Sequence, residues 1–452
     1  MTRALLISTY EMGRQSFGLA SSAAWLRAAG VDVTCVDLSR DGLPDEAVAA
    51  ANLVGWYLPM HTATRLAVPV VRRVRAVNRH AHLCAFGLYA PLNDRLLRSL
   101  GIDTVLGGEF EADLTALAAR GESPASQPVK PSPAASLPRL SFRVPDRRGL
   151  PPLDRYASLQ EPDGSQRRVG YTEASRGCKH LCRHCPVVPV YQGRFRAVPV
   201  DVVLADVAAQ VEAGARHITF GDPDFFNGIG HASKVVRRLA ALFPEVTYDV
   251  TIKIEHLLRH AAYLPMLNQT GCAFVTSAAE SIDDRVLRAL DKGHTREDFE
   301  RAVEMCRASD VVIIPTFVAF TPWTTLDGYC GLLEAIRSLD LVEATGPIQL
   351  ALRLLLTERS GLLEHPDIAS VTGPFDPESL VYPWRHPDPR VDALQAEVIA
   401  LVGRRPSASR RELFAEVWQL AHERAGGAAG VPSVPDVPVR AAIPYLNEPW
   451  YC

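Results

Sequence analysis

Residues 168–356 alternate between apolar stretches of strand length and helical stretches, and this alternation constrains the fold more than any other feature of the chain. Strands are expected at 168–175, 216–221, 247–253, 272–278, 311–320 and 348–356. Helical stretches such as "DVVLADVAAQVEAGA" and "SKVVRRLAALF" connect them. Each connection is long enough for a right-handed crossover, so the pattern predicts a partial or complete parallel (β/α)6 barrel.

The first 120 residues also alternate between strands and helices, but with shorter strands. "ALLIST", "VDVTCVDL", "NLVGWYL" and "HLCAFG" have strand character, and "GLASSAAWLRAAG" and "RLAVPVVRRVRAVNR" have helical character. This order predicts an α/β unit with a doubly wound, Rossmann-like parallel sheet. Such sheets bind ligands at the carboxyl ends of their strands. Because neither a GxGxxG nor a P-loop pattern is present, a nucleotide is not the favoured ligand.

Two changes in composition suggest where the chain divides. Residues 121–152 are rich in Pro, Ser and Ala, and residues 425–440 are rich in Gly, Ala and Pro. Both have the composition of linkers. The expected units are an α/β domain at 1–120, a linker at 121–160, a barrel at 161–365, a helical extension at 366–424 and a tether with a Cys-ending tail at 425–452.

Composition excludes several functional classes. The net charge is −3 and the pI is about 6.5, so the chain has no electrostatic signature of nucleic-acid or membrane-surface binding. The sequence contains no apolar run long enough for a signal peptide or a membrane span, which predicts a cytoplasmic protein. Nine cysteines in so long a chain favour metal binding or catalysis over a disulfide framework.

Unusual polar residues cluster just after the expected barrel strands, where βα barrels carry their chemistry. In chain order these residues are Cys178, Cys182 and Cys185; Asp222 and Asp224; Glu255 and His256; Glu280 and Ser281; Thr321 and Trp323; and Glu358, with Gln349 and Arg353 inside the sixth strand. Their common placement predicts an active site at the mouth of the barrel.

Three cysteines follow the first barrel strand in the sequence "RGCKHLCRHCP". A structural zinc site needs four ligands, and its cysteines normally come as separated pairs. Three thiolates instead suit a 4Fe–4S cluster in which one iron stays open to another ligand. The ligand count therefore favours a cluster held by Cys178, Cys182 and Cys185, with zinc as the alternative.

The C-x3-C-x2-C spacing after the first strand of a βα barrel resembles the radical S-adenosylmethionine (SAM) superfamily, over about residues 165–360. The resemblance implies that the amino and carboxylate groups of SAM chelate the open iron. It also implies that one electron from the cluster cleaves SAM to a 5′-deoxyadenosyl radical, which abstracts hydrogen from a substrate. The protein itself then mainly orients the reactants and excludes water.

The same resemblance extends, less closely, to other residues. His184 precedes the third cysteine, where the family often has a packing aromatic residue. "FGDPD" stands where the family usually has a Gly-Gly-Glu motif that contacts SAM, which implies roles for Gly221, Asp222 and Asp224. "AAESIDDRVLRALDKGHT" is similar to the fourth-strand segment of the methylthiotransferases and their cobalamin-binding relatives, and there Glu280 is expected to hold SAM or, alternatively, to be a rim ion pair.

Other polar and sulfur-containing residues are assigned from their positions alone. Glu255 and Arg353, at the barrel mouth, complete the expected cofactor-binding set. His256 and His294 are expected to be hydrogen-bonded structural groups. Five further cysteines lie in apolar stretches and are expected to act as small hydrophobic residues: Cys35, Cys84, Cys272, Cys306 and Cys330.

The α/β unit ahead of the barrel resembles the cobalamin-binding arrangement of some radical SAM proteins, in "SFGLASSAAWLRAAGVDVTCVDLS" and "LGGEFEADLTALA". The Asp-x-His-x-x-Gly motif that supplies an axial histidine to cobalt is absent from the sequence, so cobalamin is expected without that ligand. The alternative is a domain that only packs against the barrel or gates the substrate.

The last residues, "PYLNEPWYC", are similar to the end of a group of radical SAM proteins with a Cys-Cys-Ala-Glu-Pro or Cys-selenocysteine-Ala-Glu-Pro tail. The resemblance suggests that the codon after Cys452 is a UGA meant as selenocysteine, and Cys452 is then a candidate catalytic residue. The alternative is an incidental cysteine at a chain end.

Together these features favour a radical SAM enzyme that uses cobalamin to methylate or rearrange a small molecule. An electron donor such as flavodoxin or ferredoxin is the expected partner. One alternative is sulfur, selenium or arsenic transfer that needs the tail and no cobalamin, and another is a non-catalytic redox sensor. A transfer-RNA substrate lacks the basic module that would support it.

Overall fold

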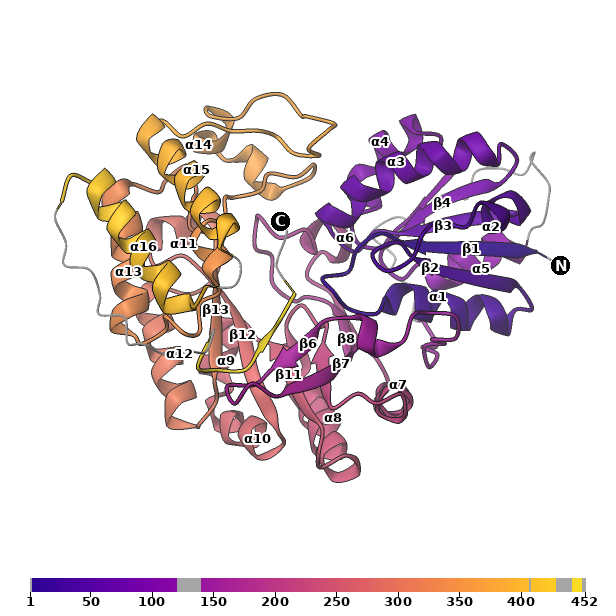
Figure 1. The fold of residues 1–452 in the computed structure, drawn as a ribbon, viewed down its shortest axis with the longest axis horizontal. Helices are drawn as coiled ribbons and strands as arrows, with labels where there is room; N and C mark the ends of the chain where they lie inside the picture. The colour runs from indigo at the N-terminus through magenta and orange to yellow at the C-terminus, as the bar shows by residue number, and fades with distance from the viewer. Residues whose placement is uncertain (1, 120–139, 406–407, 428–440, 449–452) are drawn as a thin grey trace.

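The computed structural model describes residues 2–119, 140–405, 408–427 and 441–448. Two α/β units lie side by side in it, the N-terminal one in indigo and purple and the larger one in magenta to orange (Figure 1). Residues 121–139 of the expected linker lie outside the described residues, and so does Cys452.

The N-terminal unit is a parallel sheet with the strand order β2-β1-β3-β4-β5 and helices on both faces. Its elements are β1 (Arg3–Ser8), α1 (Phe17–Ala28), β2 (Asp32–Asp37), α2 (Asp45–Ala50), β3 (Leu53–Tyr57), α3 (His61–Val77), β4 (His82–Phe86), α4 (Asp94–Ser99), β5 (Thr104–Leu106) and α5 (Glu111–Ala119). Leu5 and Ile7 pack toward α2 and α3, whereas Ala4 and Leu6 pack toward α1 and α5. Burial on both faces explains why the strands are almost wholly apolar, and it confirms the doubly wound sheet.

The second unit is a curled sheet with the order β13-β12-β11-β10-β7-β6-β14. Its strands are β6 (Ser158–Gln160), β7 (Gln166–Thr172), β10 (His217–Phe220), β11 (Thr247–Thr251), β12 (Cys272–Glu280), β13 (Ile313–Phe317) and β14 (Tyr445–Leu446). The strands β7, β10, β11, β12 and β13 are parallel to one another, and β6 and β14 extend the β7 edge as antiparallel strands. This half-barrel confirms the predicted fold class.

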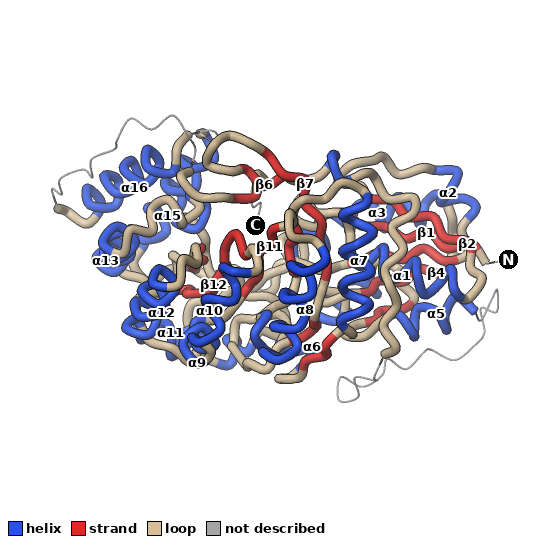
Figure 2. Tube along the Cα trace, turned by 90° about the horizontal axis from the view of Figure 1, so that it is seen from below, coloured by secondary structure: helices blue, strands red, loops and turns tan. Residues whose placement is uncertain are grey.

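Helices cover the outer side of the half-barrel (Figure 2). They are α7 (Val200–Glu212), α8 (Ile229–Leu242), α9 (Ile254–Arg259), α10 (Leu264–Gln269), α11 (Asp284–Leu290), α12 (Arg296–Ala308) and α13 (Leu326–Ser338). Val207, Val235 and Phe299 on these helices pack with Ile218 and Val275 of the strands in one continuous apolar core.

The sixth predicted strand, 348–356, is wrong. Pro347–Leu350 forms the 3-10 helix η5, because Pro347 fixes a backbone angle that suits the first turn of a helix. The Gln349 side chain then accepts a hydrogen bond from Phe317 N at 3.0 Å, which occupies a donor that a sixth strand would have used. In the described residues, a single parallel bridge between Phe320 and Arg353 remains of the expected pairing.

The C-terminal residues return to the barrel in two stages. The helices α14 (Pro366–Ala369), α15 (Pro389–Arg404) and α16 (Arg410–Arg424) follow the barrel, and α16 packs on α13. Residues 441–448 then cross to β6, where β14 pairs, and reach the N-terminal unit through Tyr10 Oη, which donates to Glu448 Oε1 at 3.1 Å. No helix within the described ranges has the length and apolar character needed to cross a bilayer.

Candidate radical SAM site

The cysteine loop begins directly after β7 and lies between two short antiparallel strands, β8 (Ser175–Gly177) and β9 (Phe195–Ala197). Gly177 makes this pairing possible, since its φ is +75° and a Cβ there would lie 2.4 Å from the Arg194 carbonyl oxygen. The strands hold both ends of the loop and turn its cysteines toward the interior. Cys182 is buried, whereas Cys178 and Cys185 are partly buried.

The three predicted ligands lie close enough to affect one another electrostatically. Burial raises the pKa of the Cys185 thiol to about 12, and the charges of Cys182 and Cys178 add to the shift. Burial also raises the pKa of Cys178. Three neighbouring thiolates are therefore unfavourable without a cation, and an iron–sulfur cluster would supply one because metal ligation deprotonates thiols. The donor set fits the predicted cluster.

Glu280, the last residue of β12, contacts the cysteine loop through His184. Its Oε1 lies 3.0 Å from His184 Nε2 and 3.2 Å from Lys292 Nζ. Burial alone would raise the pKa of Glu280, but the charge of Lys292 and the contact with His184 outweigh it, and the pKa is lowered. Lys292 is 3% exposed and also interacts with Cys182 and Cys185. Glu280, His184 and Lys292 thus form a buried polar group beside the cysteines, a role for Lys292 that the sequence analysis missed.

Asp222 binds the backbone and a side chain just before the cysteine loop. It accepts hydrogen bonds from Ala174 N at 2.9 Å and from Ser175 Oγ at 2.5 Å. Burial nevertheless raises its pKa to about 7. The preceding Gly221 has no room for a side chain, because a Cβ would lie 1.8 Å from Tyr171 Oη. In this structure Asp222 thus holds the backbone before the cysteine loop, and Gly221 makes room for the Tyr171 side chain.

Asp224 faces two histidines at the other side of the loop. Its Oδ2 lies 2.6 Å from His256 Nδ1 and 3.4 Å from His180 Nε2. Burial raises the pKa of Asp224, but these two contacts outweigh it and the net shift is downward. Together with Cys178, His180 and Asp224 place donor atoms within 4.8 Å of one another, an arrangement that could hold a metal ion.

Hydrogen-bond chemistry argues against a separate metal ion at this position. Lys253 Nζ lies 3.1 Å from His180 Nδ1, and an ammonium group can only donate. His180 Nδ1 therefore accepts, its proton sits on Nε2, and that nitrogen has no lone pair for a metal. Lys253, His180, Asp224 and His256 thus form a cluster of close polar contacts beside the loop, in which the contacts of Asp224 with the two histidines are ion-pair contacts without hydrogen-bond geometry.

The remaining predicted site residues lie at different distances from the cysteines. Glu255 Oε2 is 3.5 Å from His180 Nδ1, so the structure brings Glu255 to the group. Arg353 is turned toward the C-terminal extension, where its guanidinium lies 3.5 Å from the centre of the Trp384 ring and 2.6 Å from Asp392 Oδ1. The structure does not bring Arg353 to the cysteines. Cys452, outside the described residues, has no structural assignment.

The cysteine loop packs directly against the N-terminal unit. Cys178 and Cys185 pack on an apolar cluster that contains Val187, which follows the loop, together with Leu58 and Tyr89 at the carboxyl ends of β3 and β4. The short helix α6 (Val188–Tyr191), directly after the loop, enters the same cluster. The carboxyl edge of the doubly wound sheet, where a ligand is expected, thus lies on the side of the cysteine loop.

Buried polar atoms at this edge fit a polar ligand. Ser8 is the last residue of β1, and Glu11 lies in the loop that follows. Neither Ser8 Oγ nor Glu11 Oε2 has a hydrogen-bond partner among the described residues. Burial raises the pKa of Glu11 to about 8. Buried polar groups without partners are rare, and a bound ligand with many amide groups, such as cobalamin, would supply partners. The edge therefore fits the predicted cofactor in its hydrogen-bonding chemistry.

An ion-pair cluster that sequence reasoning missed also joins the two units. Arg176, two residues before Cys178, pairs with Glu111 at 2.7 Å, Glu173 at 2.7 Å and Glu109 at 3.4 Å. Its guanidinium also lies 5.7 Å from the centre of the Phe110 ring. Glu109 and Glu111 belong to the segment "GGEFEAD", so the motif that resembles the end of a cobalamin domain is also the docking point for the barrel.

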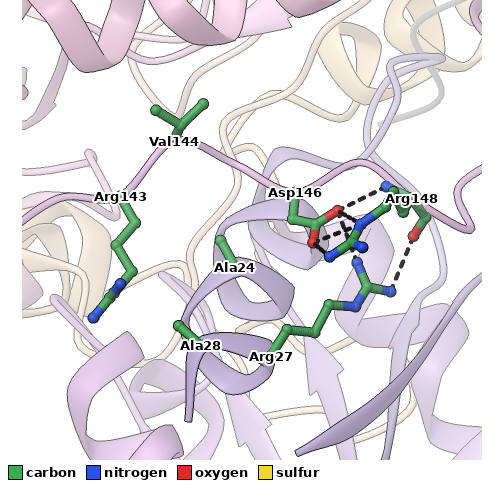
Figure 3. Close-up of a pocket in the computed structure, with 7 residues that line it drawn as sticks. All are labelled: Ala24, Arg27, Ala28, Arg143, Val144, Asp146 and Arg148. Carbon is green, nitrogen blue, oxygen red and sulfur yellow. Dashed lines mark hydrogen bonds and ion pairs between the residues drawn. The ribbon is translucent and has the colours of Figure 1, made fainter. Parts of the chain in front are cut away.

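Two cavities lie away from the cysteines. The first, of about 570 Å³, is formed by α1 and residues 143–148 and is bordered by the Arg27–Asp146 ion pair (Figure 3). The second, of about 380 Å³, opens beside the loops after β12 and β13 and is lined by Ser281, Ile282, Thr324 and Gly328, among others. The second cavity borders Ser281, the residue after Glu280, and extends to the first turns of α13.

Comparisons with known proteins match the part of the chain that contains the cysteine loop. Residues 172–322 match the family model described as the Radical SAM superfamily, and they contain the three cysteines, Asp222, Asp224 and Glu280. The tRNA-2-methylthio-N(6)-dimethylallyladenosine synthase of Chlorobium chlorochromatii (strain CaD3) is 25% identical over 181 residues, which are 39% of this chain and 39% of that protein. The same enzyme of Pseudomonas aeruginosa (strain UCBPP-PA14) is 27% identical over 193 residues, 39% of this chain and 42% of that protein. The chain thus matches less than half the length of these curated relatives.

Solved structures extend the likeness in fold beyond the family match. The radical S-adenosylmethionine methyltransferase TsrM from Kitasatospora setae, with cobalamin and a [4Fe-4S] cluster bound, superposes with a TM-score of 0.62 at 18% identity, over 75% of this chain and 74% of that one. The cobalamin-dependent S-adenosylmethionine radical enzyme OxsB, with aqua-cobalamin and SAM bound, gives a TM-score of 0.67 at 11% identity, over 90% of this chain and 67% of that one. At these identities the likeness shows the fold, here of both units together.

Proposed function

We propose that this protein is a radical SAM enzyme that holds a 4Fe–4S cluster at Cys178, Cys182 and Cys185 and binds cobalamin between its two units. The observation that carries the proposal is the apolar cluster in which Cys178 and Cys185 pack together with α6 and with residues at the carboxyl edge of the N-terminal sheet. A cofactor on that edge would lie beside the cluster. The match to the Radical SAM superfamily and the fold shared with TsrM and OxsB support the proposal.

In this proposal the bound cluster supplies the electron that cleaves SAM to methionine and a 5′-deoxyadenosyl radical, and cobalamin supplies a carrier for a methyl group or a radical. The chain itself holds and orients the reactants. Glu280 contacts His184 and Lys292 next to the cysteines, and the polar contacts among Lys253, His180, Asp224 and His256 lie at another side of the loop. The substrate is a small molecule that enters at the barrel mouth, next to the cavity lined by Ser281 and Thr324.

The test is anaerobic reconstitution of the full chain with iron, sulfide and hydroxocobalamin, followed by metal analysis and an assay for 5′-deoxyadenosine from SAM. Separate Cys178→Ala, Cys182→Ala and Cys185→Ala variants are expected to lose the cluster and the product. Cys330→Ala, on the far helix α13, is the matched control and keeps both. Cluster binding that survives all three alanine variants would refute the assignment.

Cobalt content separates the two parts of the proposal. Iron together with about one cobalt per chain supports the cobalamin site. Iron and 5′-deoxyadenosine without cobalt would leave the radical SAM activity and refute the cobalamin site. As a second variant, Ser8→Ala removes the unpaired hydroxyl from the edge without adding volume at this buried position, and we expect it to weaken cobalamin retention without loss of iron.

A further inference from the structure

The outer face of the cysteine loop has an unusual distribution of charge. From Gly177 to Val200 the sequence contains Lys179, Arg183, Arg194 and Arg196 among its cations and no Asp or Glu. Lys179 and Arg183 are exposed, whereas Cys182 between them is buried. The loop thus buries Cys182 and exposes Lys179 and Arg183, whereas Arg194 and Arg196 are partly buried.

An apolar residue lies among these charges. Leu181 is 55% exposed, one of the most exposed large apolar side chains in the described part of the chain. It lies against the backbone of Gly193, since a Cβ on Gly193 would be 3.3 Å from Leu181 Cδ2. Lys179 Nζ lies 4.8 Å from the centre of the Phe195 ring. These contacts bring both ends of the loop together, and we name Lys179, Leu181, Arg183, Arg194 and Phe195 the loop face; Arg183, at its border, donates from Nη1 to Ala289 O at 3.3 Å.

Arg196 does not belong to the loop face, because it lies close enough to Glu109 at the domain interface to affect the pKa of that carboxyl. The neighbouring turn of α11 contributes both signs of charge. Arg183 N donates to Leu290 O at 2.9 Å, which brings the exposed Arg288 and Asp291 to the border of the face. The net charge of the loop face and its border remains positive.

We propose that the loop face is the docking surface for an acidic protein that carries single electrons, such as a flavodoxin. This inference rests on the proposed function, because only a loop that holds a redox cluster has a use for an electron carrier. The apolar centre with a cationic rim is complementary to a carrier whose redox group is ringed by carboxylates. One electron leaves the carrier and enters the cluster behind Cys182, and no bond forms or breaks at the surface.

The position of the face supports this partner. Every residue from Lys179 to Arg183 is within two positions of a cluster cysteine, so a carrier seated there is separated from the cluster by one layer of loop. The side of the loop that carries Cys178 and Cys185 is covered by an apolar cluster that includes α6 and residues of the N-terminal unit.

The experiment compares two reductants for SAM cleavage by the reconstituted full chain. An Arg183→Glu/Arg194→Glu double variant reverses two charges of the loop face, and Leu181→Ala removes its apolar centre. Arg72→Glu/Arg237→Glu is the matched control, since it makes the same change in net charge at exposed positions on α3 and α8. With reduced flavodoxin we expect the double variant to raise the KM for the carrier at least about tenfold and to lose most of its dependence on salt concentration. With dithionite, all variants are expected to stay within about twofold of the wild type.

Each outcome bears on the proposal separately from the proposed function. Equal effects of the loop-face variant and the control on the flavodoxin reaction would overturn the docking surface. A loss of the dithionite reaction in the loop-face variant would also overturn it, since the charges would then act on the cluster itself. If the wild type cleaves no SAM with dithionite, the proposed function fails, and direct binding of flavodoxin to the iron-loaded chain still tests the surface. Binding that is unchanged by the double variant refutes it.

Discussion

The guanidinium of Arg176 lies 2.7 Å from the carboxylate of Glu111, and this contact joins the residue that leads into the cysteine loop to the first turn of α5 in the N-terminal unit. Arg176 is 7% exposed and Glu111 is 1% exposed. Because Glu109 and Glu173 also face this guanidinium, one cation serves several buried carboxylates. The relative position of the two units, and hence of the cluster and the edge that faces it, depends on this cation.

We expect Arg176→Gln to lower the free energy of unfolding by about 3–5 kcal/mol, because it leaves buried carboxylates without their cation. Urea unfolding followed by circular dichroism measures the change. Arg72→Gln, at an exposed position of α3, is the control and should stay within about 0.5 kcal/mol of the wild type. A similar small change for Arg176→Gln would contradict the role assigned to the cluster.

Burial of Glu11 predicts a stability that declines with rising pH. Burial raises the pKa of Glu11 from its ordinary value of 4.5 to about 8, and it raises the pKa of Glu109 to about 7. Between these limits the folded chain holds carboxyl protons that the unfolded chain has released, so these two groups lower the free energy of unfolding as the pH rises from about 5 to about 8. Buried histidines with a lowered pKa, such as His294, act in the opposite direction below about pH 6.5. Glu11→Gln cannot titrate, so its free energy of unfolding should fall less, or rise more, than that of the wild type over this range. Parallel slopes for variant and wild type in urea unfolding would show that Glu11 does not carry the effect.

Glu280→Gln tests the polar group beside the cysteines. The amide keeps the size of the side chain but removes the charge that faces Lys292 at 3.2 Å and His184 at 3.0 Å. We expect SAM to bind about tenfold more weakly, as loss of one charged hydrogen bond would predict, with unchanged iron content. Calorimetric titration with SAM measures the affinity, and Glu300→Gln on the outer helix α12 is the control. Unaltered affinity would limit Glu280 to a structural role.

The sequence predicted the parts of the fold that depend on local patterning. The strands β7, β10, β11, β12 and β13 were found because each is an apolar run between helical stretches of clear period. The sixth run failed because its pairing depends on two side chains that the pattern cannot show. Gln349 occupies the Phe317 N–H, and Arg353 turns outward to Trp384 and Asp392.

The candidate site was predicted where spacing carries chemistry and missed where only the tertiary fold creates it. The cysteine spacing identified the proposed cluster ligands from the sequence. Lys292 belongs to the segment "AAESIDDRVLRALDKGHT", but the sequence assigned it no role. Its partner Glu280 lies 12 residues earlier, and no local sequence pattern indicates that the two side chains meet. Arg176 and Glu111 are 65 positions apart and belong to different units, so their contact had no sequence signal.

The C-terminal segment provides the last prediction. Leu446 in β14 packs beside Leu159, Val169 and Phe274 on the inner side of the half-barrel, and β14 pairs with β6 through two residue pairs. So short a strand depends on its apolar contact, because two pairs contribute little on their own. We expect Leu446→Asp to release the segment and to raise amide hydrogen exchange in Ser158–Gln160 and around Tyr10 at least about tenfold, while α8 keeps its protection.

Ile399→Asp is the matched control for this experiment, since Ile399 lies on α15 and is already 39% exposed. It should leave exchange in β6 unchanged. Because Glu448 reaches Tyr10, the same measurement tests whether the C-terminal segment holds the loop after β1. Faster exchange in Ser158–Gln160 with unchanged exchange around Tyr10 would show that the segment is held at β6 and that the Tyr10–Glu448 contact does not restrain that loop.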